Sequence, residues 1–509
     1  MTSSNTEMVH SSTERELNWR SIDWEKARRE VRRLQMRIAK AVKEGKYGRV
    51  KSLQWILTHS FHAKALAVKR VTSNKGKNTP GVNGVVWKGA KAKMQAILNL
   101  RQHGYKAQPL RRTYIPKKNG KKRPLSIPTM YDRAMQALYK LGLAPVAETT
   151  ADRNSYGFRE GRSCADAVAA AFNALSKPNS ATWVLEADIT GCYDNISKSW
   201  LMENIPIEKR ILQQWLEAGY VENGISYPTR KGTPQGGIIS PMLANMTLDG
   251  LEQAIHDAVP RRMRVNFDRY ADDFITTGKS KTILVNNVLP AIIEFLKPRG
   301  LTLSEEKTKI IYIRDGFTFL GQTFRKHGNT LHITPSKEGV LALIREVGTL
   351  IRKYTSAPMV ILIKKLNEVL RGWANYHRHV VSSAAFKRVD NYVFDQLWRM
   401  LKRRHPKKSS KWLYKKYWTA AGKNWIFSVK VEQTKKDKSK KGKQKKKEVK
   451  VYQVCRVSSI GIRRHRKIKA DANPYMPEYG IYFYERRHNK EAKLLEGYNS
   501  RQMRMAYNY

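Results

Sequence analysis

The stretch Arg269-Tyr270-Ala271-Asp272-Asp273-Phe274-Ile275 places two adjacent carboxylates between aromatic and apolar residues. Neighbouring residues of a strand point to opposite faces, so two adjacent aspartates converge only at a turn. We therefore expect Ala271–Asp273 to form the tip of a hairpin. A second acidic cluster, Glu186-Ala187-Asp188, follows the apolar run Trp183-Val184-Leu185. We expect Asp188 to lie at the end of a neighbouring strand.

Converging carboxylates are suited to holding divalent cations, because magnesium prefers oxygen ligands. Phosphoryl transfer to the 3′ end of a nucleic acid uses two such cations, roughly 3.5–4 Å apart. One activates the attacking hydroxyl, and the other stabilises the triphosphate and its leaving group. An isolated aspartate pair more often caps a turn, so the assignment depends on the residues around it. On this hypothesis Asp188, Asp272 and Asp273 are the catalytic carboxylates and metal ligands of a nucleic-acid polymerase.

The charge of the chain points to the same class. Lys and Arg number 97 against 42 Asp and Glu, a formal net charge of +55, and the basic residues are spread along the whole chain. Such a positive field indicates a polyanionic partner, here nucleic acid. A ribosome-like packing protein would be basic for the same reason. A length of 509 residues and acidic pairs on apolar strands are unusual for that alternative.

Cysteine usage and hydropathy exclude other classes. The three cysteines, Cys164, Cys192 and Cys455, lie far apart without a CxxC pair, so neither a disulfide framework nor a cysteine zinc site is indicated. The polar N-terminus lacks a signal region. No apolar run approaches the ~18 residues that a membrane span needs. We expect a cytoplasmic protein without a membrane partner.

Periodicity predicts the main elements. Apolar residues recur at helical spacing from Trp24 to Ile38 and from Val50 to Leu57. Further helices are predicted over 132–143 and 340–403, and strands over 113–116, 123–127, 425–431 and 449–451. Residues 1–20 are predicted to be a disordered lead, and the lysine-rich run 435–447 to be a disordered loop between two strands.

An ordered series of motifs surrounds the two acidic clusters. It resembles the reverse transcriptases encoded by group II introns, over about residues 20–480. In chain order the matching motifs are Asn78–Gly84 (NTPGVNG), Arg123–Leu125 with Asp132, Arg133 and Gln136, Ser155–Arg159 (SYGFR), Glu186–Asn195, Gly232–Pro241, the Tyr270–Asp273 motif, Phe319–Gly321, and Arg371–His377 (RGWANYH).

The resemblance implies an α+β right-hand polymerase, with fingers, a palm built on an antiparallel sheet, and a helical thumb. It implies an N-terminal helical extension and a small C-terminal DNA-binding domain as well. The expected boundaries are 1–20 for the lead, 21–110 for the helical extension and template loop, 111–335 for fingers and palm, 336–418 for the thumb or maturase region, and 419–509 for the basic DNA-binding domain.

The same resemblance assigns roles near the carboxylates. Two magnesium ions are expected on the three aspartates, and the Ile189 carbonyl would complete the second metal site. Tyr193 would place a ring beneath the incoming sugar and disfavour a 2′-hydroxyl, although ordinary core packing also suits it. Gln235 and Gly236 would lie against the nucleotide.

Basic residues of the fingers and the palm follow from the resemblance too. Lys117, Lys122 and Arg123 would contact the triphosphate, and some of them, Lys117 above all, are equally suited to the template backbone. Lys307 is a candidate to assist the departure of pyrophosphate, and a solvated lysine at a strand end is the alternative.

Nucleic-acid contacts are expected from Asn78, Asn83, Trp373, Tyr376, Arg464 and His465. Asn83 stands where the family usually has Asp, away from the metals. Many relatives continue into a zinc-supported His-Asn-His endonuclease with paired cysteines. This sequence matches the preceding segment and shows no cysteine pair, so that domain is expected to be absent. His465 is therefore expected to face nucleic acid rather than zinc.

The expected function is that of a maturase and an RNA-directed DNA polymerase. The protein would bind its intron RNA, promote splicing, and copy the RNA into DNA from deoxynucleoside triphosphates at a target DNA during retrohoming. It would be nucleoid-associated as a ribonucleoprotein. The alternatives are a maturase that no longer polymerises, against which the three aspartates argue, and a domesticated reverse transcriptase of phage defence or DNA repair.

Overall fold

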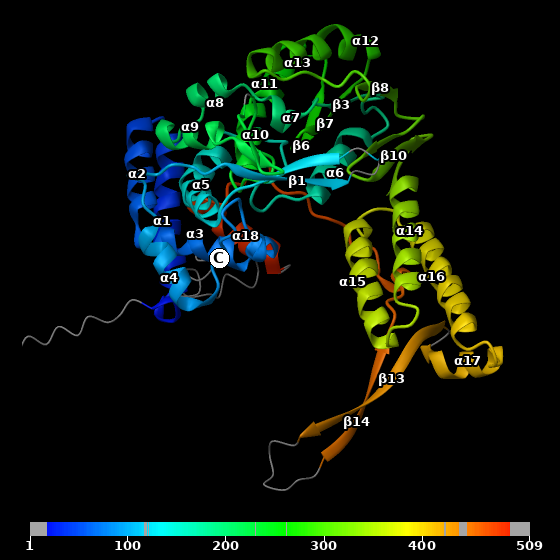
Figure 1. The fold of residues 1–509 in the computed structure, drawn as a ribbon. Coiled ribbons are helices and arrows are strands. Elements are labelled where there is room, and N and C mark those ends of the chain that lie inside the picture. The colour runs from blue at the N-terminus through cyan, green and yellow to red at the C-terminus, as the bar shows by residue number, and fades with distance from the viewer. Residues whose placement is uncertain are drawn as a thin grey trace, which may run out of the picture.

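The computed structural model describes residues 18–116, 120, 122–229, 231–260, 262–421, 424–436 and 445–488. A group of N-terminal helices comes first (Figure 1). Its members are α1 (Trp24–Lys43), α2 (Tyr47–His59), α3 (Phe61–Ser73) and α4 (Gly89–Asn99), with short 3₁₀ turns at Trp19–Ser21 and Lys75–Asn78. Asp23 caps α1 by accepting hydrogen bonds from the Glu25 and Lys26 amides. The two helices predicted from Trp24 and Val50 are confirmed.

Helix α5 (Met130–Thr150) joins this group to the rest of the chain. It contacts α1, α2 and α3, and most of its residues are buried around its whole circumference. Thr129 caps it through the Asp132 amide. A helix buried on all sides belongs to a core rather than a surface, so α5 is the common support of the N-terminal helices and the sheets beyond them.

The finger strands form a hairpin of β1 (Leu110–Pro116) and β2 (Lys122–Ile127), as predicted. The order of their sheet is β2-β1-β4-β5, in which β4 (Tyr220–Glu222) pairs parallel to β1 and antiparallel to β5 (Ile225–Tyr227). Lys117, expected to contact the triphosphate, lies outside the described residues. Residues 1–17 of the expected N-terminal lead lie outside them too, whereas 18–20 enter the first 3₁₀ turn.

The palm is a four-stranded antiparallel sheet in the order β6-β7-β3-β8. Its strands are β3 (Trp183–Asp188), β6 (Asn266–Tyr270), β7 (Asp273–Gly278) and β8 (Lys309–Tyr312). Its helices are α6 (Cys164–Leu175), α7 (Cys192–Asn195), α8 (Lys198–Asn204), α9 (Lys209–Glu217), α10 (Ser240–Leu248), α11 (Leu251–Asp257), α12 (Lys281–Ile283) and α13 (Leu289–Leu296). A π-helical turn at Leu284–Val288 separates the last two. Val184, Leu185 and Ile275 are fully buried beneath the sheet's helices.

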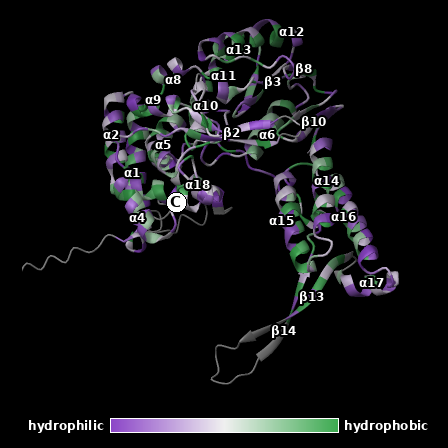
Figure 2. Cartoon of the chain, viewed as in Figure 1, coloured by the Kyte–Doolittle hydropathy of each residue, from purple (hydrophilic) through white to green (hydrophobic). Residues whose placement is uncertain are grey.

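The thumb follows a small sheet of β9 (Phe317–Phe319), β10 (Gln322–His327) and β11 (Thr330–Pro335). It consists of α14 (Lys337–Lys353), α15 (Met359–His377) and α16 (Ser383–Arg404), with α17 (Ser410–Tyr417) beneath them. Figure 2 shows apolar and hydrophilic residues interspersed along these helices. Val347, Leu366 and Leu397 lie in their shared core. The α+β right-hand fold expected from the sequence is confirmed.

Beyond the thumb the chain forms the sheet β12 (Trp418–Ala421), β13 (Asn424–Lys436) and β14 (Lys445–Gln453). The strands extend into the predicted loop 435–447 from both sides, because the β13–β14 ladder continues as far as the Lys436–Lys445 pair. The rest of that loop lies outside the described residues. A 3₁₀ turn at Val457–Ser459, another at Pro477–Tyr479 and α18 (Gly480–His488) follow.

Residues 456–479, here called the return segment, run from the thumb back past the palm to the N-terminal helices (Figure 1). Successive contacts are Arg463 N to Arg378 O (2.9 Å), Ile468 N to Asp166 Oδ1 (2.7 Å), Asn473 Nδ2 to Thr149 Oγ1 (3.0 Å), and the Arg32 guanidinium to Pro474 O. One extended stretch therefore ties together three lobes that are far apart in sequence.

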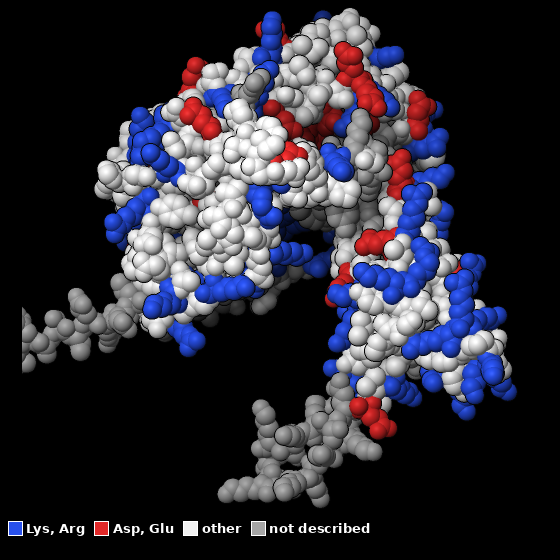
Figure 3. Space-filling model, in the orientation of Figure 1, with Lys and Arg blue, Asp and Glu red and all other residues white. Residues whose placement is uncertain are grey.

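On the face that Figure 3 shows, groups of lysine and arginine side chains lie on the N-terminal helices and on the thumb. The two lobes border a hollow, and lysines and arginines reach it from both sides (Figure 3). Within the described residues, no helix has both the length and the apolar character that crossing a bilayer demands.

Arg269, directly before the acidic hairpin, is fully buried. Its Nη2 lies 2.5 Å from Asp249 Oδ1 and 3.8 Å from Asp152 Oδ2, and its Nη1 donates to Asn245 Oδ1. Burial raises the pKa of Asp249 to about 7, and the Arg269 charge opposes that rise. This buried cation holds two carboxylates at the base of the hairpin.

We predict that Arg269→Met strongly destabilises the protein, because removing one partner of a buried pair typically costs about 3–5 kcal/mol. A thermal melt at neutral pH checks this, with exposed Arg325→Met as the matched control. The deficit should shrink as the pH falls, since without the cation the pKa of Asp249 rises further above its unfolded value and protonation relieves the buried charge. Equal melting temperatures for the two variants would contradict the prediction.

Candidate active site

The acidic motif forms the predicted hairpin tip. Strands β6 and β7 pair so that Tyr270 lies opposite Asp273, which leaves Ala271 and Asp272 as a two-residue turn. Asp188 is the last residue of β3 and lies directly opposite Asp273. The hairpin tip and the strand end are both confirmed, and the pairing brings all three carboxylates to one end of the sheet.

The turn is held in a conformation that its sequence does not favour. Ala271 has a φ of +60°, a region that L-residues with a side chain rarely adopt. Gly157, from the SYGFR motif, packs against it so closely that a Cβ on Gly157 would lie 2.4 Å from the Ala271 amide nitrogen. Strain of this kind persists only where the surroundings impose it. The motif at 155–159 therefore packs tightly against the turn that carries Asp272 and helps to hold it in this conformation.

The carboxylates perturb one another. Although part of Asp273 reaches solvent, desolvation and then the charges of Asp272 and Asp188 raise its pKa to about 6. Desolvation also raises the pKa of Asp272, and Asp188 adds to that rise. The Lys307 ammonium is ion-paired with Asp188. That hydrogen bond raises the pKa of Lys307, and Asp273 and Asp272 contribute to the rise.

Lys307 shows that the three carboxylates attract a cation, which a metal site requires. Its ammonium is a cation that interacts with all three carboxylates, so the cluster already attracts positive charge. Within the described residues no three acidic, histidine or cysteine side chains form a ready-made metal shell. Magnesium sites of phosphoryl-transfer enzymes typically use one or two carboxylates plus substrate phosphates and water, and the residues present fit that type.

The orientation of the Ile189 carbonyl follows from the hydrogen bonds of its neighbours. The Ser304 amide donates to Asp188 O, and the Thr190 amide donates to Thr302 O, both at the edge of β3 that faces Leu303. Backbone groups alternate sides along an extended strand. The Ile189 carbonyl therefore points to the opposite edge, where the hairpin lies.

Tyr193 lies in α7, immediately after β3. The half-buried ring packs on the palm core, which the alternative assignment expected. Desolvation and the Asp272 charge raise the pKa of its hydroxyl, and Arg123 opposes the rise. The ring therefore stands between the core and the acidic turn. Both of the assignments given to Tyr193 are compatible with this position.

The loop with Gln235 and Gly236 bridges the palm and the fingers. The Ser126 amide of β2 donates to Gln235 O at 2.7 Å. Gly236 has a φ of +116°, and a Cβ there would lie 2.5 Å from Ser126 O. Glycine is required for so close an approach. Lys122 and Arg123 lie earlier on the same β2 strand with exposed side chains, and the Arg123 charge opposes the rise in the pKa of Asp272, which places Arg123 near the acidic turn.

The remaining predicted residues lie on several elements. Asn78 and Asn83 are exposed on a loop fixed by Arg133, whose guanidinium donates to the Gly76 carbonyl at 3.1 Å and to that of Thr79. The Asn83 Oδ1 accepts from the Val85 amide, so it caps its own turn as an aspartate would. These contacts leave both asparagines accessible to a template.

In the thumb, Trp373 is half-buried against Phe386 and His377. Tyr376 is 40% exposed and donates its hydroxyl to Leu320 O. Arg464, on the return segment, is exposed. The roles of all three in nucleic-acid binding stay predictions.

His465 has a structural partner that the sequence reasoning missed. Its Nε2 lies 2.9 Å from Asp166 Oδ1, which also accepts from Arg486 Nη2. Burial alone would raise the pKa of Asp166, but the hydrogen bonds from His465 and Ser163 and the Arg486 charge lower it to about 2. Ser163 and Asp166 form a capping box, a spacing readable in the sequence. The contact between Asp166 and His465 could not be predicted from the sequence.

Fold and site together define a template-dependent nucleic-acid polymerase of the right-hand class. The family model described as reverse transcriptase (RNA-dependent DNA polymerase) matches residues 115–324. Models for the N-terminal domain of reverse transcriptase and for the group II intron maturase-specific domain match 19–100 and 340–418. The chain belongs to the family of group II intron-encoded reverse transcriptases and maturases.

The chain is similar to several individual proteins. Protein YkfC of Escherichia coli is 31% identical over 301 residues, which cover 50% of this chain and 78% of that protein. The group II intron-encoded protein LtrA of Lactococcus lactis is 33% identical over 289 residues, 55% of this chain and 45% of LtrA. The chain thus matches less than half the length of LtrA. A solved telomerase from Candida albicans has a TM-score of 0.35 at 12% identity, covering 60% of this chain and 63% of that one.

We predict that Lys307→Met lowers the melting temperature in EDTA and enlarges the rise that millimolar magnesium produces. The variant removes the ammonium that partly neutralises three carboxylates and competes with an added cation. Lys309→Met, an exposed lysine of adjacent β8, is the matched control. A magnesium-induced shift that is the same in wild type and both variants would show that Lys307 does not compete for the site.

Proposed function

We propose that this chain binds the RNA of its own group II intron, favours the splicing-competent fold of that RNA, and copies it into DNA after intron insertion at a target DNA. The observation that carries the proposal is the meeting of Asp188, Asp272 and Asp273 in a polymerase palm that is followed by a maturase-type thumb. Both jobs need a basic surface, and the chain carries a net charge of +55.

For the polymerase, we propose two magnesium ions on Asp188, Asp272 and Asp273 with the Ile189 carbonyl. Bound there, they would lower the pKa of the primer 3′-hydroxyl and neutralise charge on the phosphates. The chain's own residues do the positioning. Lys122 and Arg123 reach the triphosphate from β2, since lysine supplies a point charge and arginine a two-pronged donor to phosphate oxygens.

In this proposal the loop at Gln235 and Gly236 forms the floor under the nucleotide. Gly236 admits the close backbone approach that a side chain would block, and the Ser126–Gln235 hydrogen bond keeps the floor attached to the fingers. The Tyr193 ring lies beside Asp272, where it selects against a 2′-hydroxyl. Lys307 is ion-paired with Asp188, where released pyrophosphate would meet a positive charge.

For the maturase, affinity for intron RNA comes mainly from phosphate contacts and falls steeply with salt. Specificity comes from RNA shape and from unpaired bases. Asn78 and Asn83 on the Arg133-bound loop, and Arg464 on the return segment, are proposed contacts. A maturase without polymerase activity is the second candidate function. The three retained carboxylates argue against it.

We predict that Asp272→Asn lowers primer extension on an RNA template by about a thousandfold or more, because metal-assisted stabilisation of several kcal/mol is lost. RNA binding should stay within about twofold, because the substitution preserves shape and the chain keeps its basic surface. Asp395→Asn, an exposed aspartate of the thumb, is the matched control. Extension by the Asp272 variant at the wild-type rate would refute the metal assignment.

We predict that Tyr193→Ala raises the ratio of ribonucleotide to deoxynucleotide incorporation by about tenfold or more. The reason is that the ring no longer fills the space beside the sugar. Single-turnover kinetics with matched nucleotide pairs measure the ratio. Tyr193→Phe, which keeps the ring, should behave as wild type. If the ratio is unchanged and only stability falls, Tyr193 is a core residue.

A further inference from the structure

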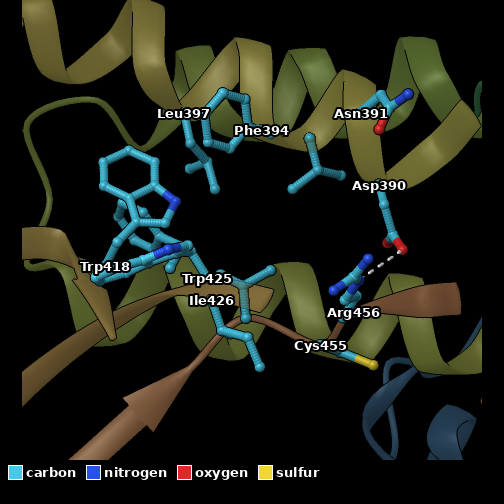
Figure 4. Close-up of a pocket in the computed structure, with 12 residues that line it drawn as sticks. Asp390, Asn391, Phe394, Leu397, Trp418, Trp425, Ile426, Cys455 and Arg456 are labelled. Atoms are coloured by element: carbon cyan, nitrogen blue, oxygen red, sulfur yellow. Dashed lines mark ion pairs between the residues drawn. The ribbon is translucent and has the colours of Figure 1, made fainter. Parts of the chain in front are cut away.

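A cavity of about 340 Å³ lies between helix α16 and the β12–β13 strands, far in sequence from the palm carboxylates. Figure 4 shows Phe394 and Leu397 entering it from the helix, and Trp418, Trp425 and Ile426 from the strands. The opposite end carries Asn391, Asp390 and Arg456 (Figure 4). The cavity thus has an aromatic end and a polar end, and its size is in the range of small-ligand sites.

Two of the aromatic rings are too exposed to serve only as core residues. Trp425 is 51% exposed and Phe394 is 42% exposed, whereas Trp418 between them is 4% exposed. Trp425 packs on Tyr414 with ring centroids 4.7 Å apart, and Phe394 packs on Trp418 at 5.5 Å. Each ring is therefore supported from behind, and both contribute to the cavity wall. Rigidly supported, solvent-facing rings are suited to stacking on a planar ligand.

Charge around the rings identifies the ligand class. Helical spacing places Lys387, Phe394, Trp398 and Lys402 along one stripe of α16, and both lysines are exposed. The Lys402 ammonium lies 5.6 Å from the centroid of the Trp398 ring. Basic side chains on both sides of an aromatic pocket match a polyanionic backbone that presents a base between its phosphates.

The polar end of the cavity includes an amide side chain that suits the edge of a base. Asp390 already accepts from the Val457 and Ser458 amides at 2.7 and 2.9 Å, and its carboxylate lies 3.8 Å from Arg456 Nε. Asn391, the next residue of α16, is exposed at the same end of the cavity. An asparagine amide both donates and accepts, as the hydrogen-bonding edge of a base demands.

We propose that this cavity is a binding site for a single unpaired nucleobase, held by stacking on Trp425 and Phe394, with Asn391 at its edge and Lys387 and Lys402 at the flanking phosphates. The site is independent of the polymerase carboxylates. RNA and single-stranded DNA present the same chemistry here, and the experiment distinguishes them.

The test uses the full-length protein and two twelve-nucleotide probes, oligouridylate with one central 5-iodouridine and its oligodeoxythymidylate counterpart with 5-iododeoxyuridine. Ultraviolet cross-linking followed by peptide mass spectrometry should place the halogenated base on the peptide with Trp425 or Phe394. A cross-link to that peptide from the RNA probe names RNA as the source of the base, and one from the DNA probe names DNA. Cross-links from both probes that map only elsewhere would overturn the proposal.

Fluorescence anisotropy supplies the energetic arm. Trp425→Ala and Phe394→Ala should each weaken binding of the cross-linking probe about tenfold, as expected for loss of one base–aromatic stack. The slope of log affinity against log salt should be unchanged, because no phosphate contact is removed. Trp55→Ala, a 62% exposed tryptophan on α2 outside the cavity, is the matched control. Affinities equal to wild type in both cavity variants would also overturn the proposal.

Primer extension at saturating primer–template separates this proposal from the proposed polymerase function. The cavity variants should retain activity within about twofold, because neither residue touches the palm. Thermal melts verify that each variant is folded. Phe394, on a long helix, provides an independent reading should Trp425→Ala disturb β13.

Discussion

At the active end of the palm, the fold holds together three carboxylates that repel one another. Asp188, Asp272 and Asp273 are negative charges brought to one strand end, and two unit charges about 4 Å apart near a protein surface repel by about 4 kcal/mol. Desolvation raises the pKa values of Asp272 and Asp273, and the neighbouring carboxylate charges raise them further. The β3–β7 register fixes Asp188 opposite Asp273, and fully buried Leu185 and Ile275 maintain that register. A one-residue slip would send one carboxylate to the other face of the sheet.

Two neighbouring cations oppose this repulsion, because Lys307 lowers the pKa of Asp272 and Asp273 and Arg123 lowers that of Asp272. Lys307 is ion-paired with Asp188 at the carboxylates themselves, whereas Arg269, directly before the hairpin, is bound to Asp249. Gly157 packs against the strained turn at Ala271, next to Asp272. The cations differ in exposure, since Arg269 is fully buried whereas Lys307 is mostly solvent-accessible. A buried pair is a permanent part of the fold, whereas an exposed lysine is free to yield its place to a stronger cation.

The sequence alone predicted what depends on local order. The hairpin at 270–273, the finger strands and the helices from Trp24 and Val50 follow from periodicity and turn chemistry, and the family follows from motif order. The long-range interactions of Asp166 could not be predicted, because His465 and Arg486 lie 299 and 320 residues further along the chain and no local pattern encodes that distance. The prediction of a loop over 435–447 is wrong at both ends. A run of lysines suggests a solvated loop, but the β13–β14 ladder continues as far as the Lys436–Lys445 pair.

The path of the return segment has a consequence for how the protein treats nucleic acid. The thumb is joined to the palm by the small sheet β9–β11 on one side and by residues 456–479 on the other, with Asp166 at the crossing point. Two separate connections restrict rotation of the thumb far more than a single linker does. The width of the hollow between the thumb and the N-terminal helices is therefore set largely by these two connections. The lysines and arginines that reach this hollow from both lobes are therefore held at positions that the two connections restrict.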